Sequence, residues 1–582
     1  MLFSSLSRAT AVVSASALLF SSSFGGFYAA SEAIGASLSQ LLRGRPGHFT
    51  DTPRSAYLGA KPGRSAKDRG GLWSKNALAA AERSGSPLQA NTKPEGYFLR
   101  STAVAAAPGS SLPWEGSFGG VNSGNGNKLT SLHLFSWKTR GGMSVDFTLF
   151  HNSQSVYNDE LGHGWSWTFD AYINEDPMMG IATVRWPDET CIPYTLGWSG
   201  YTAPTGIFDT LVKNGNGTWT VTKKDQTKYH FNDDGYLTEV EDRNGNTITI
   251  TLNGANYATR VTDATGRYYD IDLDGSNNFE SVTSPDGEVW TFTRNGSDDL
   301  TEVEWPEVDS VVYTDEFAYS SHMITTHTDK RGEDWTFTYN GDKSLATEKN
   351  PYNHTWTYTY NTTYTDLTNP LSKTTRHNYS SGKLASVVDE ASYSVSQTLG
   401  AVNKPTSVTD KRGKTWSYTY DSKGNLLTKT NPLSKTWTYT YDGDNNLLTA
   451  TDPLSNVTEY DYDASGNLTD VEDPLNRATA ENVYDAYGQL LSVENALGKI
   501  TEFTYDADGN LETIEDPLTH TTTMDYDSMS RLISTTDALS NEEEVAYDEW
   551  GRPVTYTHAD TSTSLVAYDA ESNTTATDLP PF

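Results

Sequence analysis

Aromatic and hydroxyl side chains alternate along short segments in the C-terminal two-thirds of the chain. Residues 415–420 read Thr-Trp-Ser-Tyr-Thr-Tyr, and residues 355–360 and 436–441 both read Thr-Trp-Thr-Tyr-Thr-Tyr. A period of two places successive side chains on opposite faces of a β-strand. Each segment is therefore predicted to be a strand with one aromatic face and one hydroxyl face.

A Tyr-Asp pair stands at the end of each such strand and recurs at a fixed interval. Six of the seven steps between the last eight pairs are 21 residues, and one is 22. A constant period of this length is typical of one supersecondary unit stacked many times, with contacts between neighbours. The pairs are Tyr420-Asp421, Tyr441-Asp442, Tyr462-Asp463, Tyr484-Asp485, Tyr505-Asp506, Tyr526-Asp527, Tyr547-Asp548 and Tyr568-Asp569.

Two turn signals divide each repeat. In the unit that begins at Tyr505, the first signal is residues 506–510, Asp-Ala-Asp-Gly-Asn, where Asp closes a turn and Gly supplies a positive φ. The second is residues 516–518, Asp-Pro-Leu, where Pro fixes φ. Two stretches of about six residues, a typical strand length, lie between the turns. One repeat is therefore predicted to be one β-hairpin.

The repeat continues upstream in weaker form. Phe231 stands where the tyrosine would, with Gly235 and Leu237 at the expected offsets. The array is predicted to span residues 207–570, roughly seventeen repeats. The step from Arg294 to Tyr319 is 25 residues and predicts a bulge or a longer loop. A single hairpin buries too little apolar surface to offset the cost of ordering it, about 1.5 kcal/mol per residue, so an isolated repeat should be unfolded.

These features resemble the YD repeats of the RHS family, which wall-associated proteins and teneurins share in looser form. The in-phase Tyr-Asp pairs carry the resemblance, together with residues 151–153, His-Asn-Ser, and residues 161–165, Leu-Gly-His-Gly-Trp. The resemblance implies an all-β fold in which stacked hairpins form a long spiralling antiparallel sheet, a partial YD shell. It also implies an N-terminal β region over residues 113–206 and a tail over residues 571–582.

In that family the shell often encloses a C-terminal toxin. The sequence shows no recognisable core segment, self-cleaving Asp or toxin domain, so toxin release is not predicted.

The N-terminus resembles a secretory signal. Within residues 1–33, Arg8 precedes an apolar stretch over residues 9–20 that is too short for a membrane span. Residues 34–112 are rich in Gly, Ser, Ala and Pro and are predicted to be a flexible basic linker, mostly disordered. We therefore expect an exported protein, extracellular or associated with the cell envelope. An uncleaved anchor and an organelle transit peptide are the alternatives.

Charge and cysteine content narrow the functional classes. The formal net charge is −34, and an acidic surface of this size disfavours nucleic-acid binding. The single cysteine, Cys191, excludes an intrachain disulfide and is predicted to be a buried small hydrophobe.

The sequence contains none of the common catalytic or phosphate-binding motifs. His322 and His327, the closest histidines, should face opposite sides of a strand, which disfavours a metal site. A pair of glycosidase carboxylates is not excluded, but nearly every Asp repeats in register at a turn. Calcium at acidic turns such as residues 506–510 is the one cofactor candidate, although the Gly position differs from that of an EF-hand.

The sequence therefore predicts an exported scaffold without catalysis that presents a surface or forms part of a β shell around an enclosed or downstream partner protein. One alternative is an adhesin for an extracellular glycan or a cell-envelope polymer. Another is a truncated or split polymorphic-toxin carrier, and a third is an enzyme within residues 113–206. The candidate glycan-stacking aromatics are Trp335, Trp356, Trp416 and Trp437.

Overall fold

The computed structural model describes residues 120–475 and 477–578. The predicted signal peptide and linker lie outside the described residues. Within them, every element except one three-residue 3-10 helix is a β-strand, and 36 strands form one sheet in the order of the sequence. The all-β fold of stacked hairpins in a long antiparallel sheet is confirmed.

The N-terminal β region contains three small sheets, with strand orders β1-β2-β5, β3-β4 and β6-β7-β8-β9. Its elements are β1 (Leu129–Lys138), η1 (Arg140–Gly142), β2 (Ser144–Asn152), β3 (Asn158–Asp159), β4 (Gly162–His163), β5 (Trp165–Trp167), β6 (Tyr172–Asp176), β7 (Ile181–Arg185), β8 (Cys191–Gly197) and β9 (Gly200–Thr202). Cys191 is half-buried. Among the described residues, no helix is long and apolar enough to span a membrane.

The large sheet begins at β10, and each of its strands pairs antiparallel with the next. Its first half comprises β10 (Thr210–Lys213), β11 (Trp219–Thr222), β12 (Lys228–Phe231), β13 (Leu237–Glu241), β14 (Thr247–Leu252), β15 (Ala258–Thr262), β16 (Tyr268–Leu273), β17 (Phe279–Thr283), β18 (Val289–Arg294), β19 (Leu300–Val308), β20 (Val311–Ser320), β21 (Met323–Thr328), β22 (Asp334–Tyr339), β23 (Leu345–Lys349), β24 (Thr355–Tyr360), β25 (Tyr364–Thr368), β26 (Thr374–Ser380) and β27 (Lys383–Val388). Its second half comprises β28 (Ser394–Leu399), β29 (Pro405–Thr409), β30 (Thr415–Tyr420), β31 (Leu426–Thr430), β32 (Thr436–Tyr441), β33 (Leu447–Thr451), β34 (Val457–Tyr462), β35 (Leu468–Glu472), β36 (Ala478–Tyr484), β37 (Leu490–Asn495), β38 (Ile500–Tyr505), β39 (Leu511–Glu515), β40 (Thr521–Tyr526), β41 (Leu532–Thr536), β42 (Glu542–Tyr547), β43 (Pro553–Thr557), β44 (Thr563–Tyr568) and β45 (Thr574–Asp578).

Irregular steps in the sequence correspond to bulges in the sheet. The 22-residue step coincides with a register shift between Val471 and Glu472, where β35 pairs with β36. The 25-residue step contains the long strands β19 and β20, and their register shifts between Trp305 and Val308. The predicted irregularity is therefore a bulge between lengthened strands, because the extra residues extend the hairpin instead of its loop.

The residues assigned from the sequence to a C-terminal tail begin with a further strand. β45 pairs with β44, with Tyr568 opposite Thr574. The last Tyr-Asp turn closes a hairpin like the preceding ones, because the Asp569 carboxylate accepts the backbone N–H groups of Glu571 and Asn573.

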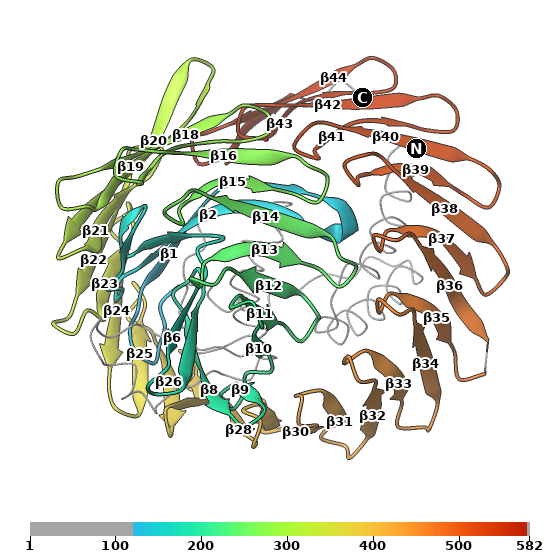
Figure 1. The fold of residues 1–582 in the computed structure, drawn as a ribbon, viewed down its shortest axis with the longest axis horizontal. Helices are drawn as coiled ribbons and strands as arrows, with labels where there is room; N and C mark the ends of the chain where they lie inside the picture. The colour runs from blue at the N-terminus through green and yellow to red at the C-terminus, as the bar shows by residue number, and fades with distance from the viewer. Residues whose placement is uncertain (1–119, 476, 579–582) are drawn as a thin grey trace.

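The sheet curves into a spiral, and its hairpin turns form two rims (Figure 1). We call the turns that follow even-numbered strands of the sheet, such as residues 421–425, the YD rim. We call the turns that follow odd-numbered strands, such as residues 242–246 and 431–435, the Pro rim. The strand twist that all L-residues share makes such a long sheet coil instead of lying flat.

The second spiral turn places its YD rim on the Pro rim of the first. Arg243 Nε donates to the backbone oxygen of Ser465 at 2.7 Å. Arg531 pairs with Asp286 at 3.1 Å, and Trp550 Nε1 donates to the backbone oxygen of Pro306 at 2.8 Å. These partners are 222 to 245 residues apart in the sequence, which is the length of chain in one spiral turn.

The N-terminal β region covers the concave face of the first spiral turn. Phe147, which is fully buried, contacts the rings of Tyr269 at 5.3 Å and Phe292 at 6.3 Å. The N-terminal β region also packs on part of the YD rim of this turn, since the Ile173 N–H donates to the Gly235 oxygen at 2.8 Å. The concave face therefore carries the aromatic residues, and the hydroxyl face of the strands points outward.

Candidate functional site

Each Tyr-Asp turn uses its aspartate as a cap. Asp506 Oδ1 accepts the backbone N–H groups of Asp508 and Asn510 at 2.9 and 2.8 Å, and its Oδ2 accepts the Asn510 side-chain amide at 2.9 Å. Gly509 follows with φ of 80°, as the turn requires. The same pair of backbone hydrogen bonds recurs at Asp421, Asp442, Asp463, Asp485, Asp527, Asp548 and Asp569.

These carboxylates are therefore already engaged by their own turns, which leaves the calcium hypothesis without support from the turn geometry. Among the described residues, one group, His230, Glu239 and Glu241, brings candidate ligand atoms within 4.8 Å of one another. That group is half-exposed on neighbouring strands, and Lys228 binds Glu241 at 2.6 Å. It forms a surface ion-pair network without needing a cation.

Five of the eight tyrosines of the Tyr-Asp pairs connect one hairpin to the hairpin before it. Tyr462 donates its hydroxyl proton to the backbone oxygen of Leu447 at 2.9 Å, and Tyr505 donates to Leu490 at 2.9 Å. Burial raises the pKa of Tyr505 to about 12, which keeps the hydroxyl a donor. Equivalent bonds are made by Tyr441, Tyr547 and Tyr568. The hydroxyl explains why tyrosine, not phenylalanine, occupies these positions.

Replacing Tyr462 with phenylalanine should lower the free energy of unfolding by about 1 kcal/mol, because it removes one hydrogen bond and leaves the Leu447 oxygen without it. Tyr460→Phe is the matched control, since Tyr460 lies on the same face of β34 and is half-buried. Urea unfolding followed by tryptophan fluorescence measures the difference. Equal effects of the two substitutions would contradict the role assigned to the hydroxyl.

The four candidate glycan-stacking tryptophans all lie on the concave face. Trp335 and Trp356 pack against the main core cluster. Trp416 and Trp437 are half-buried and stack on each other, with ring centroids 6.5 Å apart and planes 29° apart. The Lys429 ammonium lies 4.8 Å from the Trp416 ring. The structure thus brings one pair together, and their binding of sugars stays a prediction.

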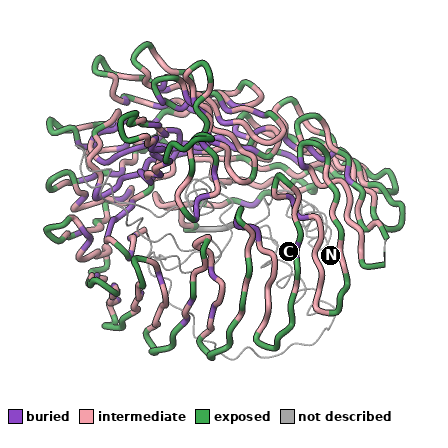
Figure 2. Tube along the Cα trace, turned by 60° about the horizontal axis from the view of Figure 1, so that its bottom comes forward, coloured by how far each residue is buried: buried purple, intermediate pink, exposed green. Residues whose placement is uncertain are grey.

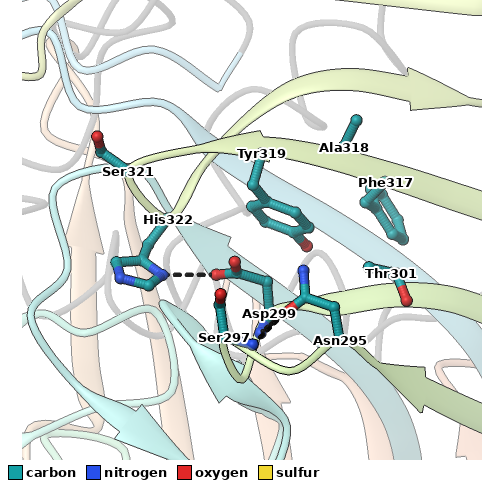
Figure 3. Close-up of a pocket in the computed structure, with 9 residues that line it drawn as sticks. All are labelled: Asn295, Ser297, Asp299, Thr301, Phe317, Ala318, Tyr319, Ser321 and His322. Atoms are coloured by element: carbon teal, nitrogen blue, oxygen red, sulfur yellow. Dashed lines mark hydrogen bonds and ion pairs between the residues drawn. The ribbon is translucent and has the colours of Figure 1, made fainter.

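A polar pocket of about 460 Å³ opens at the YD rim of the first spiral turn, between β19 and β20 (Figure 3). His322 Nδ1 and Asp299 Oδ1 lie 2.7 Å apart at its mouth. The His163 ring contacts the His322 ring, with centroids 3.7 Å apart and planes tilted by 32°, so the N-terminal β region reaches the same place. No hydrogen bond connects Ser297 or Ser321 to His322 among the described residues. The Asp–His pair joins two turns of the rim, and the contact of His163 with His322 connects the N-terminal β region to them.

The two histidines singled out from the sequence have separate partners. His327 Nε2 lies 2.6 Å from Asp315 Oδ1, and its ring stacks on Phe317. His322 sits in the turn with φ of 66°. They are not brought together.

A buried charge cluster in the N-terminal β region had no signal in the sequence. Arg185 binds Asp159 at 2.7 Å and Asp170 at 2.6 Å. Glu189 is almost fully buried, and one of its oxygens accepts the Ser155 hydroxyl at 2.6 Å. Burial raises the pKa of Glu189 to about 8, because a single arginine does not compensate the desolvation of several carboxyls. Arg185 and Asp159 lie on separate strands and Asp170 and Glu189 on loops, so only the tertiary fold assembles them.

The free energy of unfolding should fall as pH rises from about 7 to about 8. In the unfolded chain Glu189 ionises near pH 4.3. The folded chain therefore holds an extra proton up to its pKa of about 8, and its stability is lost as pH rises through that value. The stability change linked to His151, whose pKa burial lowers to about 4, is complete below this range. Glu189→Gln should make the decline in melting temperature shallower, and the rest of the decline belongs to Glu160, whose pKa burial also raises to about 8. Glu280→Gln, at an exposed site, should leave the decline unchanged.

Three family models match parts of the chain. The RHS Repeat model matches residues 401–433 and 420–456, and the Teneurin YD-shell model matches residues 458–573. A Domain of unknown function (DUF6531) matches residues 119–194. None of the curated proteins matches the chain in sequence.

Solved structures of Tc toxin components are also similar. The crystal structure of TcdB2-TccC3 shares 13% identity over 75% of this chain, with a TM-score of 0.38. The structure of the Photorhabdus luminescens Tc holotoxin pore shares 12% identity over 75% of this chain, with a TM-score of 0.37. The chain covers about a quarter of each, 27% and 26% of their lengths. The hairpin array of this chain, with its regular period and Tyr-Asp caps, thus matches RHS-repeat and teneurin YD-shell models over residues 401–456 and 458–573.

Proposed function

We propose that the chain is an exported scaffold without catalysis whose concave face forms part of a β shell around a partner protein. The observation that carries the proposal is a difference between the two halves of the concave face. In the first spiral turn, residues such as Tyr269 and Val282 are fully buried beneath the N-terminal β region. In the second, the rings of Trp416, Tyr418 and Trp437 are half-buried. A half-buried aromatic surface suits a partner that exposes apolar side chains.

A scaffold role also agrees with the chemistry of the described residues. The carboxylates of the array cap turns, and the Asp–His pairs join elements of the fold. The matched families with descriptions are repeat and shell families, not enzyme families.

Binding of a defined unfolded polypeptide tests the concave face. A reduced, carboxymethylated, fluorescently labelled polypeptide should bind the full chain and gain protection from protease. Trp416→Ser with Trp437→Ser should abolish both effects. The control is Ser417→Ala with Thr438→Ala, which alters the outward face of the same strands. Equal binding by both double variants would reject the concave face as the partner surface.

Export is tested separately. The full chain should be recovered outside the cytoplasm, and removal of residues 1–33 should retain it inside. Cytoplasmic location of the intact chain would reject the exported role and leave the concave-face result unaffected.

Glycan binding is the second candidate function. The stacked Trp416–Trp437 pair with Lys429 beside it is the observation that favours it, since aromatic faces pack against sugar rings. A glycan array on which the full chain shows no signal would exclude it. A split toxin carrier is the third candidate function. It would be supported if the next gene in the genome encoded a toxin domain.

A further inference from the structure

We propose that two copies of this chain associate through the Pro rim of their second spiral turns. Six leucines, which we call the leucine row, lie at the third position of six consecutive Pro-rim turns. Each is between 70% and 83% exposed. They are Leu433, Leu454, Leu475, Leu497, Leu518 and Leu539. Figure 2 shows that most hairpin ends of the array are exposed.

The same turn position is polar where the rim is covered. On the first spiral turn it holds Asn244, Asp286 and Arg331, which contact Asn467, Arg531 and Asp569 of the second turn. The rim thus carries hydrogen-bonding groups at these covered turns, and leucine at six consecutive turns that the described chain leaves open. The leucine row would therefore be covered best by an apolar surface of a partner.

The leucine row has the size of an interface. Soluble proteins rarely expose apolar patches above a few hundred Å². At on the order of 100 Å² for each exposed leucine side chain, two rows would bury about 1,200 Å², the lower bound for stable protein interfaces.

The row is also complementary to itself. Successive turns are two strands apart, roughly 9.6 Å, so the leucines of a second row have the same spacing and can face those of the first. A two-fold axis that lies in the plane of the rim and passes between Leu475 and Leu497 maps a circular arc of turns onto itself in reverse order. Self-complementary two-fold contacts are the commonest in homo-oligomers.

Charge distribution favours this reversed order. The turn before the row carries Arg412, whose side chain is 85% exposed, and the first leucine turn ends in exposed Lys435. The far end of the row is followed by exposed Glu542 and Asp560. Reversal places Lys435 of one copy near Glu542 of the second, and Arg412 near Asp560. Pairing in the same order would put like charges together. The net charge of −34 argues against an anionic lipid surface as the occupant.

Sedimentation velocity of the full chain from nanomolar to high micromolar concentration tests the proposal. We expect a monomer–dimer equilibrium. Leu475→Lys with Leu497→Lys places four ammonium groups at the two-fold axis and should weaken the dimer roughly 100-fold or more. Leu371→Lys is the matched control, because Leu371 occupies the same turn position at 79% exposure outside the paired segment. All these sites are exposed, and circular dichroism should confirm unchanged folding.

A charge swap provides the second readout. Lys435→Glu alone should weaken the dimer, and Lys435→Glu with Glu542→Lys should restore it. A chain that stays monomeric at every concentration overturns the proposal. So does a dimer that loses affinity equally with Leu371→Lys, or one that the charge swap does not restore.

Discussion

Replacing Phe147 with alanine should lower the free energy of unfolding by about 3–5 kcal/mol. Phe147 is fully buried and contacts rings from both layers, including Phe135 and Trp167 of its own region and Tyr269 of the array. The substitution leaves a cavity at the interface between the N-terminal β region and the first spiral turn. Its packing contacts are lost on both sides.

Trp198→Ala is the control, since Trp198 is fully exposed in the same region. Urea unfolding gives the loss of stability, and amide hydrogen exchange should show faster exchange in β14–β18 than in β38–β44. An effect no larger than that of the control would mean that the N-terminal β region does not stabilise the array.

Replacing Gly235 with alanine should cost more stability than the same change at Gly266, although the two glycines have nearly equal φ of 92° and 96°. Both alanines carry the left-handed penalty of about 1–2 kcal/mol. A Cβ at Gly235 would also lie 2.1 Å from the backbone oxygen of Ile173, whereas nothing lies within 4 Å of one at Gly266. Because the obstacle is backbone, the N-terminal β region has to move away, at a further cost of about 1–3 kcal/mol.

Thermal unfolding of both variants measures the difference. The Ile173 N–H donates to the Gly235 oxygen, so its faster hydrogen exchange in the Gly235 variant would show that the loss of stability arises at this contact. If both variants lose the same stability and the Ile173 N–H stays protected from exchange, the N-terminal β region does not need the contact between the rim and β6 to pack on the array.

The hairpin unit was predictable because its signals are local. The alternation in residues 436–441, the Asp506 cap and the positive φ of Gly509 each act within a few residues, and the structure shows each in its expected place. The bulge expected from the 25-residue step is also present in β19 and β20.

The sites were less predictable. The His322–Asp299 pair joins neighbouring turns of the rim, and its contact with His163 depends on how the N-terminal β region docks. The Arg185 cluster joins two strands and a loop that are not neighbours in the sequence. No spacing in the sequence marks either of them.

By itself the sequence determined the repeating hairpin, its two faces and its two kinds of turn, because period and turn chemistry are encoded within each 21 residues. The tertiary structure alone decided which turns meet and which leucines remain open. Those outcomes depend on small twists added over the more than 220 residues of one spiral turn, and Arg243 meets Ser465 only through their sum.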